Sequence, residues 1–175
     1  VDKGGNAIGS VGTSNQVDVV YIRDDGGFDV AATSAATSVR LQTNNTVTQS
    51  GVIDTPLLIL TSSGAGTGDF NLGTQNNVLT DVQTSNTVNT IALRDDAGFT
   101  VGSLSVDTAL TLSTDGAVDQ SAVINVPTLT LESAGGSGVF TLNTQANTIT
   151  TLTTGASTVD QVAFRDDGGF AVGTL

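Results

Sequence analysis

The chain lacks cysteine, methionine, histidine and tryptophan, and these absences narrow the classes of protein to which it can belong. Without cysteine it has no disulfide and no thiolate. Without histidine and cysteine, most nucleophile–base pairs used in covalent catalysis cannot be assembled. The joint absence of cysteine and methionine fits a long extracellular protein that avoids oxidisable side chains, so we expect an extracellular or cell-surface location.

Basic residues are scarce as well. Only 5 Lys and Arg stand against 17 Asp and Glu, which gives a formal net charge of -12. Nucleic acids and anionic lipid surfaces are bound through clustered Lys and Arg, so the composition argues against both partners. No apolar run approaches the roughly 18 residues of a membrane span, and we expect no membrane insertion.

What the chain has is a repeat of 71 residues. Pro56 and Pro127, the only two prolines, are separated by this distance. One six-residue string follows the same spacing through three copies, Arg23-Asp24-Asp25-Gly26-Gly27-Phe28, Arg94-Asp95-Asp96-Ala97-Gly98-Phe99 and Arg165-Asp166-Asp167-Gly168-Gly169-Phe170. We therefore interpret residues 1–175 as one continuous array, with a partial unit 1–33 and two units, 34–104 and 105–175, and we expect further copies outside it.

Within each unit the side chains alternate between apolar and polar, as in Leu110-Thr111-Leu112-Ser113, and Gly, Asn, Asp and Ser clusters interrupt the runs. This pattern predicts short, half-buried strands joined by turns. The unit is small for a β-sandwich and its inward residues are small aliphatics, which favours stacked coils. We predict an all-β parallel β-solenoid with three or four coils per unit, a whole number if corresponding features stack in line.

The Arg-Asp-Asp-(Gly/Ala)-Gly-Phe string is the one charged constellation, and its first interpretation is structural. Asp and Gly build a tight turn, Gly supplies a positive φ, Phe points inward and Arg offsets the carboxylate charge. This interpretation assigns the structural repeat positions Arg23, Gly27, Phe28, Arg94, Gly98, Phe99, Arg165, Gly169 and Phe170.

Two other interpretations of this string stay open. The paired carboxylates are weak candidates for oxygen ligands of Ca²⁺, and they are Asp24, Asp25, Asp95, Asp96, Asp166 and Asp167. Carboxylate pairs also perform acid/base chemistry in β-helical enzymes that cleave polysaccharides. An active site is normally built once, however, whereas this motif is copied with the repeat. We therefore assign no catalytic residue and no cofactor.

The stretches Ala109-Leu110-Thr111-Leu112, Pro127-Thr128-Leu129-Thr130-Leu131 and Gly138-Val139-Phe140-Thr141-Leu142-Asn143 resemble the repeats of filamentous-haemagglutinin-like exoproteins. The resemblance spans the whole chain and implies a right-handed parallel β-helix. It also implies a very large secreted or surface-exposed bacterial protein with a role in adhesion or biofilm formation.

We thus expect a non-catalytic structural or adhesive stalk or fibre segment. Its expected partners are neighbouring repeats of the same chain, end-to-end copies, and a host or matrix surface ligand. The alternatives are a β-helical carbohydrate-active enzyme and a Ca²⁺-dependent binding module.

Overall fold

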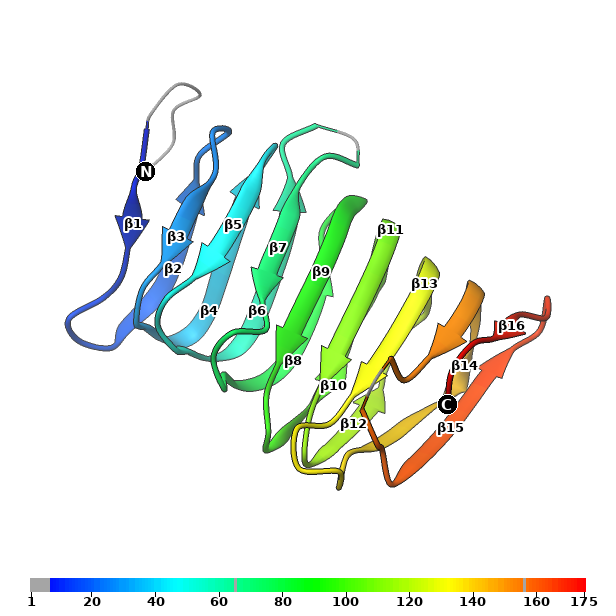
Figure 1. The fold of residues 1–175 in the computed structure, drawn as a ribbon. Coiled ribbons are helices and arrows are strands. Elements are labelled where there is room, and N and C mark those ends of the chain that lie inside the picture. The colour runs from blue at the N-terminus through cyan, green and yellow to red at the C-terminus, as the bar shows by residue number, and fades with distance from the viewer. Residues whose placement is uncertain (1–6, 65, 156) are drawn as a thin grey trace.

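The computed structural model describes residues 7–64, 66–155 and 157–175, which form 16 β-strands (Figure 1). Among these residues no helix is long and apolar enough to cross a membrane. The strands are β1 (Ser10–Val11), β2 (Val17–Arg23), β3 (Phe28–Val30), β4 (Thr33–Thr43), β5 (Thr46–Gln49), β6 (Ile53–Ser62), β7 (Asp69–Leu72), β8 (Val78–Thr84), β9 (Val88–Arg94), β10 (Gly98–Val101), β11 (Leu104–Ser113), β12 (Ala117–Gln120), β13 (Ile124–Glu132), β14 (Val139–Thr153), β15 (Gln161–Asp166) and β16 (Ala171–Val172).

Every strand pair is parallel, and the strands form two sheets. Odd-numbered strands from β1 to β13 make sheet A, even-numbered strands from β2 to β12 make sheet B, and the long β14 continues both sheets. The chain alternates between the sheets and builds about 8 stacked coils of about 19 residues each. In Figure 1 the strands of sheet A descend in front and those of sheet B ascend behind as the chain advances from left to right, so the coil is right-handed. The predicted parallel β-solenoid is confirmed.

A single apolar core runs between the two sheets along the whole stack. It extends from Val20 to Leu152 and consists mainly of Val, Leu and Ile, with Phe70 and Phe140 as its largest fully buried side chains. Inward residues lie directly under one another, as Leu110 and Leu129 do in neighbouring strands. Burying each such side chain contributes roughly 1.5–3 kcal/mol before ordering entropy is subtracted. Each coil therefore covers the apolar edge that its neighbour leaves open.

The long strands are bent and supply a third face to each coil. In β4 the register shifts between Ser34 and Val39, and in β11 it shifts between Ser105 and Ala109. Exposed residues occupy both bends, at 36–37 and 107–108. The residues before each bend form the third face, which comprises 33–35, 53–55 and 78–79 in the first half of the chain and 104–106, 124–126 and 147–149 in the second.

Successive units are related by half a turn. Strand β4 lies in sheet B, whereas β11, which is its equivalent 71 residues later, lies in sheet A. The short strands exchange in the opposite sense, since β5 lies in sheet A and its equivalent β12 in sheet B. From β4, three steps along sheet B lead through β6 and β8 to β10, and the chain then crosses to β11.

One unit thus spans three and a half coils, between the two predicted numbers, and equivalent features do not stack in line. At about 4.8 Å per coil each unit advances about 17 Å along the axis. The third face moves to the opposite edge of the solenoid with each unit. A side chain that projects from sheet B in one unit has its equivalent projecting from sheet A in the next.

Candidate functional site

The three Arg-Asp-Asp strings form three separate corners, after β2, β9 and β15. The corners after β2 and β15 connect sheet B to sheet A, whereas the corner after β9 connects sheet A to sheet B. The half-turn relation therefore places the middle corner on the opposite edge from the other two. Along the axis, consecutive corners are about 17 Å apart. The structure thus does not bring the three predicted copies together into one site.

The first Asp of each string is a buried hydrogen-bond acceptor. Asp95 is fully buried, and its Oδ2 accepts the backbone N–H of Leu79 at 2.6 Å. Its Oδ1 accepts the N–H groups of Ala97 at 2.9 Å and Gly98 at 3.2 Å within the turn. The carboxylate therefore ties its own corner to the coil before it.

The other two corners repeat this arrangement. Asp24 accepts the N–H of Ile8 at 2.6 Å, and Asp166 accepts that of Ile149 at 2.8 Å. In the middle and last corners, the donor lies where the third face ends on that edge of the solenoid, because the next coil has a tight turn there instead of a strand. The donor N–H has no carbonyl below it, and the carboxylate supplies the missing acceptor.

Burial raises the pKa of the Asp95 carboxyl above its ordinary value of 3.8. The three backbone N–H groups oppose this effect, since they favour the charged form, while the neighbouring Asp96 carboxylate adds to it. A buried carboxyl that spends its oxygens on backbone donors has a structural role in the first instance.

The second Asp of each string pairs with the Arg of the same string. Asp96 accepts two hydrogen bonds from Arg94, at 2.8 and 2.6 Å, and Asp167 accepts two from Arg165, both at 2.9 Å. The hydrogen bond to Asp96 raises the pKa of Arg94, and the one from Arg165 lowers the pKa of Asp167. Such exposed pairs contribute little to stability, roughly 0–1 kcal/mol each, so they serve mainly to balance charge.

In the first corner the equivalent ion pair is longer. Arg23 Nη2 lies 3.6 Å from Asp25 Oδ2. The guanidinium thus accompanies the second carboxylate in all three copies.

The Gly and Phe positions complete the corner. Gly27, Gly98 and Gly169 have φ values of 85°, 96° and 87°, which an L side chain rarely adopts. A Cβ at Gly98 would lie 2.1 Å from the carbonyl oxygen of Ala117 in the next coil. Phe28 and Phe99 are buried in the core, whereas Phe170 packs edge-on against Phe164 in the last coil, with ring centroids 5.1 Å apart.

The geometry gives no preformed cation site among the described residues, where no cluster of three or more acidic side chains occurs. In each corner the first carboxylate already accepts backbone N–H groups and the second already pairs with Arg. A Ca²⁺ ion, which needs six or more oxygen ligands, would have to displace these contacts.

Sequence reasoning missed two buried amides that belong to the same corners, Asn77 and Asn147. Asn77 Oδ1 accepts the N–H of Ile53 at 2.9 Å, and its Nδ2 donates to the carbonyl oxygens of Leu72 and Arg94, both at 3.0 Å. Asn77 also accepts a short hydrogen bond from the side chain of Gln49.

Asn147 repeats this set in the next unit. It accepts from Ile124 N–H at 3.0 Å and from Gln120, and it donates to Leu142 and Arg165. The amide thus links three successive coils at the step where the third face changes edge. The equivalence of Asn77 with Asn147 at a spacing of 70, beside Gln49 and Gln120 at 71, was the available signal.

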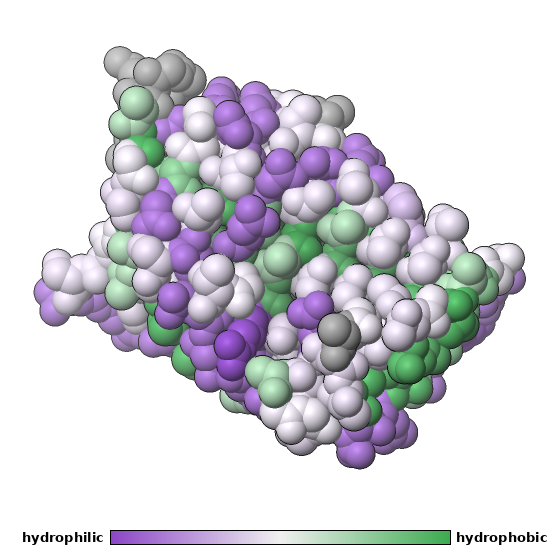
Figure 2. Space-filling model, in the orientation of Figure 1, coloured by the Kyte–Doolittle hydropathy of each residue, from purple (hydrophilic) through white to green (hydrophobic). Residues whose placement is uncertain are grey.

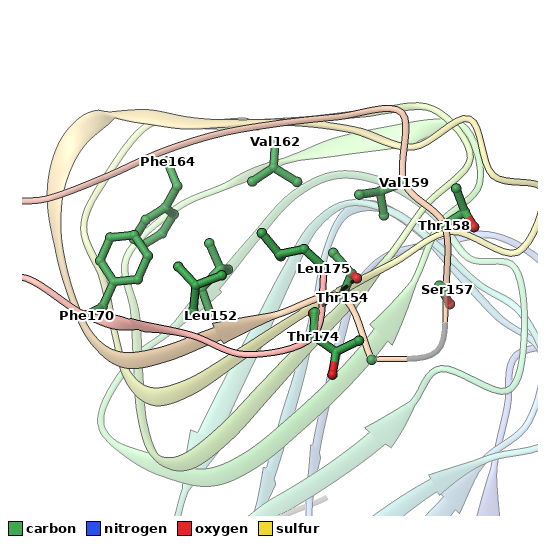
Figure 3. A pocket seen from close by; sticks show the side chains of 12 residues that line it. Leu152, Thr154, Ser157, Thr158, Val159, Val162, Phe164, Phe170, Thr174 and Leu175 are labelled. Carbon is green, nitrogen blue, oxygen red and sulfur yellow. Dashed lines mark hydrogen bonds between the residues drawn. The ribbon is translucent and has the colours of Figure 1, made fainter.

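The last coil leaves the apolar core open to solvent. A cavity of about 640 Å³ lies there, and its walls include Leu152, Val162, Phe164, Phe170 and Val172 (Figure 3). The residues equivalent to Val162, Phe164, Phe170 and Val172 in the middle unit are Ile91, Leu93, Phe99 and Val101, all buried beneath the following coil. The cavity is therefore the uncovered end of the spine.

Comparison with family models, with curated proteins and with solved structures found no match for this chain. The resemblance to filamentous-haemagglutinin-like exoproteins is thus supported at the level of the fold, because the chain is a β-helical repeat protein.

Proposed function

We propose that this chain is a non-catalytic structural and adhesive segment of a large extracellular or cell-surface fibre of the filamentous-haemagglutinin type. The observation that carries the proposal is the uninterrupted apolar spine shared by units that differ only by half a turn. Such a stack gains length with each added unit without needing a new core.

The solenoid is built for stacking along its axis. The described chain contains no charged helix or other cap over the last coil, whose core residues Phe164 and Val172 line the open cavity. Inside the stack the equivalent positions are covered by the next coil. Neighbouring repeats are therefore the first partners of this surface, either in the same chain or end to end.

Chains with one, two and three additional 71-residue units appended provide the test. We expect small-angle scattering to show a rod that lengthens by about 17 Å per unit at constant cross-section. The melting temperature should rise with the first added unit, because that unit covers the open cavity. A string of separate globules, or an increment unrelated to the coil rise, would disprove the proposal.

The adhesive part of the proposal has its own test. A repeated surface engages a repeated ligand through avidity, so binding to a cell or matrix layer should rise more than linearly with copy number. Chains of every length should be compared at equal unit concentration. Absence of binding at every copy number would leave the chain a spacer and refute its adhesive role.

A further inference from the structure

We propose that two copies of this chain associate side by side, with the sheet-B face around Tyr21 of one copy seated in a groove on sheet A of the other. This goes beyond the fibre role, which needs only contacts along the axis. The argument starts from four positions whose side chains differ in size between units.

On sheet B of the first unit these positions carry bulky side chains, which we call the bulky face. They are Val19, Tyr21, Arg40 and Ile59, which lie on three neighbouring strands. Val19 and Tyr21 are 53% and 42% exposed, which is unusual for large apolar side chains in this molecule. The Arg40 guanidinium carbon lies 5.4 Å from the centre of the Tyr21 ring, and the Tyr21 hydroxyl bonds Gln42. The bulky face is thus held in a fixed shape.

On sheet A of the second unit the same four positions carry Thr90, Ala92, Thr111 and Thr130, which are all small. A shallow groove of about 470 Å³ lies there, and its lining includes Asn71, Ala92, Arg94, Thr111, Ser113 and Glu132. Figure 2 views the face of sheet A and shows mainly pale residues over these strands. The groove thus occupies the place that Tyr21 and Arg40 fill in the first unit.

The charges of the two surfaces are complementary. Within the described part of the chain, Arg40 makes no ion pair, and its buried Nε has no hydrogen-bond partner. Glu132 in the groove makes no ion pair among the described residues either, and the charge of Arg94 beside it is balanced by Asp96. A cation that enters the groove therefore meets an unpaired carboxylate.

The half-turn relation fixes the kind of assembly. The bulky face and the groove lie on opposite sides of one molecule, so neither can fill the other within the chain. A second copy presents the matching surface to each. Because the two contacting surfaces differ, the contact is head-to-tail in the lateral direction and leaves one bulky face and one groove free, which lets further copies add.

Sedimentation velocity over a range of concentrations gives the test. We expect the wild-type chain to form dimers and larger species, and Arg40→Glu or Glu132→Arg to weaken association at least tenfold. A mixture of R40E and E132R chains should re-associate, because the altered face of one chain meets the altered groove of the other. This mixture should stop at a one-to-one dimer, since the remaining surfaces repel.

A steric variant tests the groove without changing Glu132. Ala92→Tyr combined with Thr111→Arg gives the second unit the side chains that the first unit carries at the same positions, so the fold should tolerate them. We expect association to be lost while the melting temperature stays within a few degrees of wild type. Circular dichroism at matched concentration verifies that the fold is retained.

The control separates this contact from end-to-end stacking. Val172 is 56% exposed and lines the cavity at the last coil. Val172→Lys should disrupt stacking along the axis and leave the lateral dimer intact. A wild-type chain that stays monomeric at millimolar concentration, association that survives in A92Y/T111R, or association that V172K abolishes would each overturn the inference.

Discussion

The Oδ2 atom of Asp95 lies 2.6 Å from the backbone nitrogen of Leu79, 16 residues earlier in the chain. Leu79 belongs to the last strand of the third face on its edge of the solenoid, and Asp95 opens the tight turn that replaces this face in the next coil. One side chain thus satisfies the donor that the change of edge leaves over. The same contact joins Asp166 to Ile149 in the following unit.

Removing this acceptor should be costly. We expect Asp95→Ala to lower the free energy of unfolding by roughly 1–3 kcal/mol, because the N–H of Leu79 is left buried without an acceptor. Asp95→Asn keeps one acceptor oxygen and should lose less. Urea unfolding measures both, and Asp96→Asn, which alters only an exposed ion pair, is the matched control with a loss below about 1 kcal/mol. Equal losses at Asp95 and Asp96 would contradict the capping role.

Two glycines of the corner motif separate backbone strain from steric clash. Gly98 and Gly169 have similar positive φ values, 96° and 87°, but a Cβ at Gly98 would lie 2.1 Å from Ala117 O, whereas one at Gly169 meets no heavy atom within 4 Å. Gly169→Ala should cost about 1 kcal/mol, the strain alone. Gly98→Ala should cost about 3 kcal/mol, because the next coil must also move.

Thermal and urea unfolding of both variants checks this difference. Gly9→Ala is the control, since Gly9 has neither a positive φ nor a close neighbour. A loss at Gly169 as large as that at Gly98 would mean that backbone conformation alone dominates.

Much of the architecture could be predicted from local patterns. Alternation such as Leu110-Thr111-Leu112 sets which side chains face the core, and the three copies of the Arg-Asp-Asp string reveal the repeat. Parallel stacking follows because small inward side chains suit neighbouring coils. The role of Phe99 as a core residue also follows from its place after the turn.

The half-turn relation could not be predicted in the same way. A spacing of 71 residues limits the number of coils only if the length of each coil is known, and loops of different length make the coils unequal. Inward and outward alternation is the same in sheet A and sheet B, so it does not show that β4 and β11 lie on opposite sides. The amide network of Asn77 escaped for a related reason, because Asn in a Gly- and Asn-rich stretch is also a common turn residue.

Asn77 offers a prediction that tests this network. Its side chain serves donors and acceptors on three coils, including the N–H of Ile53 and the carbonyl of Arg94. We expect Asn77→Ala to lower the free energy of unfolding by about 3 kcal/mol, since several buried groups lose a partner at once. Asn71→Ala, at an outward position of β7, should change it by less than about 0.5 kcal/mol. Similar effects at both positions would show that the network contributes nothing.

The pH dependence of stability should contain two opposing contributions. Hydrogen bonds from Ser50, Ser10 and Thr48 hold the pKa of Asp29 below 3.8, whereas burial raises that of Asp95 above 3.8. The stability contributed by Asp29 is thus complete above pH 3.8 and is lost as pH falls through its folded-state pKa. For Asp95 the folded state holds the proton more tightly than the unfolded state, so stability declines as pH rises from 3.8 through its folded-state pKa.

Urea midpoints measured from about pH 2 to about pH 7 resolve the two contributions. We expect Asp29→Asn to make the loss of stability at acid pH shallower than in the wild type. We expect Asp95→Asn to remove part of the decline that begins above pH 3.8. Because the two carboxyls differ in burial and in partners, the two variants should change the profile in opposite directions. If both variants displaced the whole profile by a constant amount, neither carboxyl would have a pKa altered by folding.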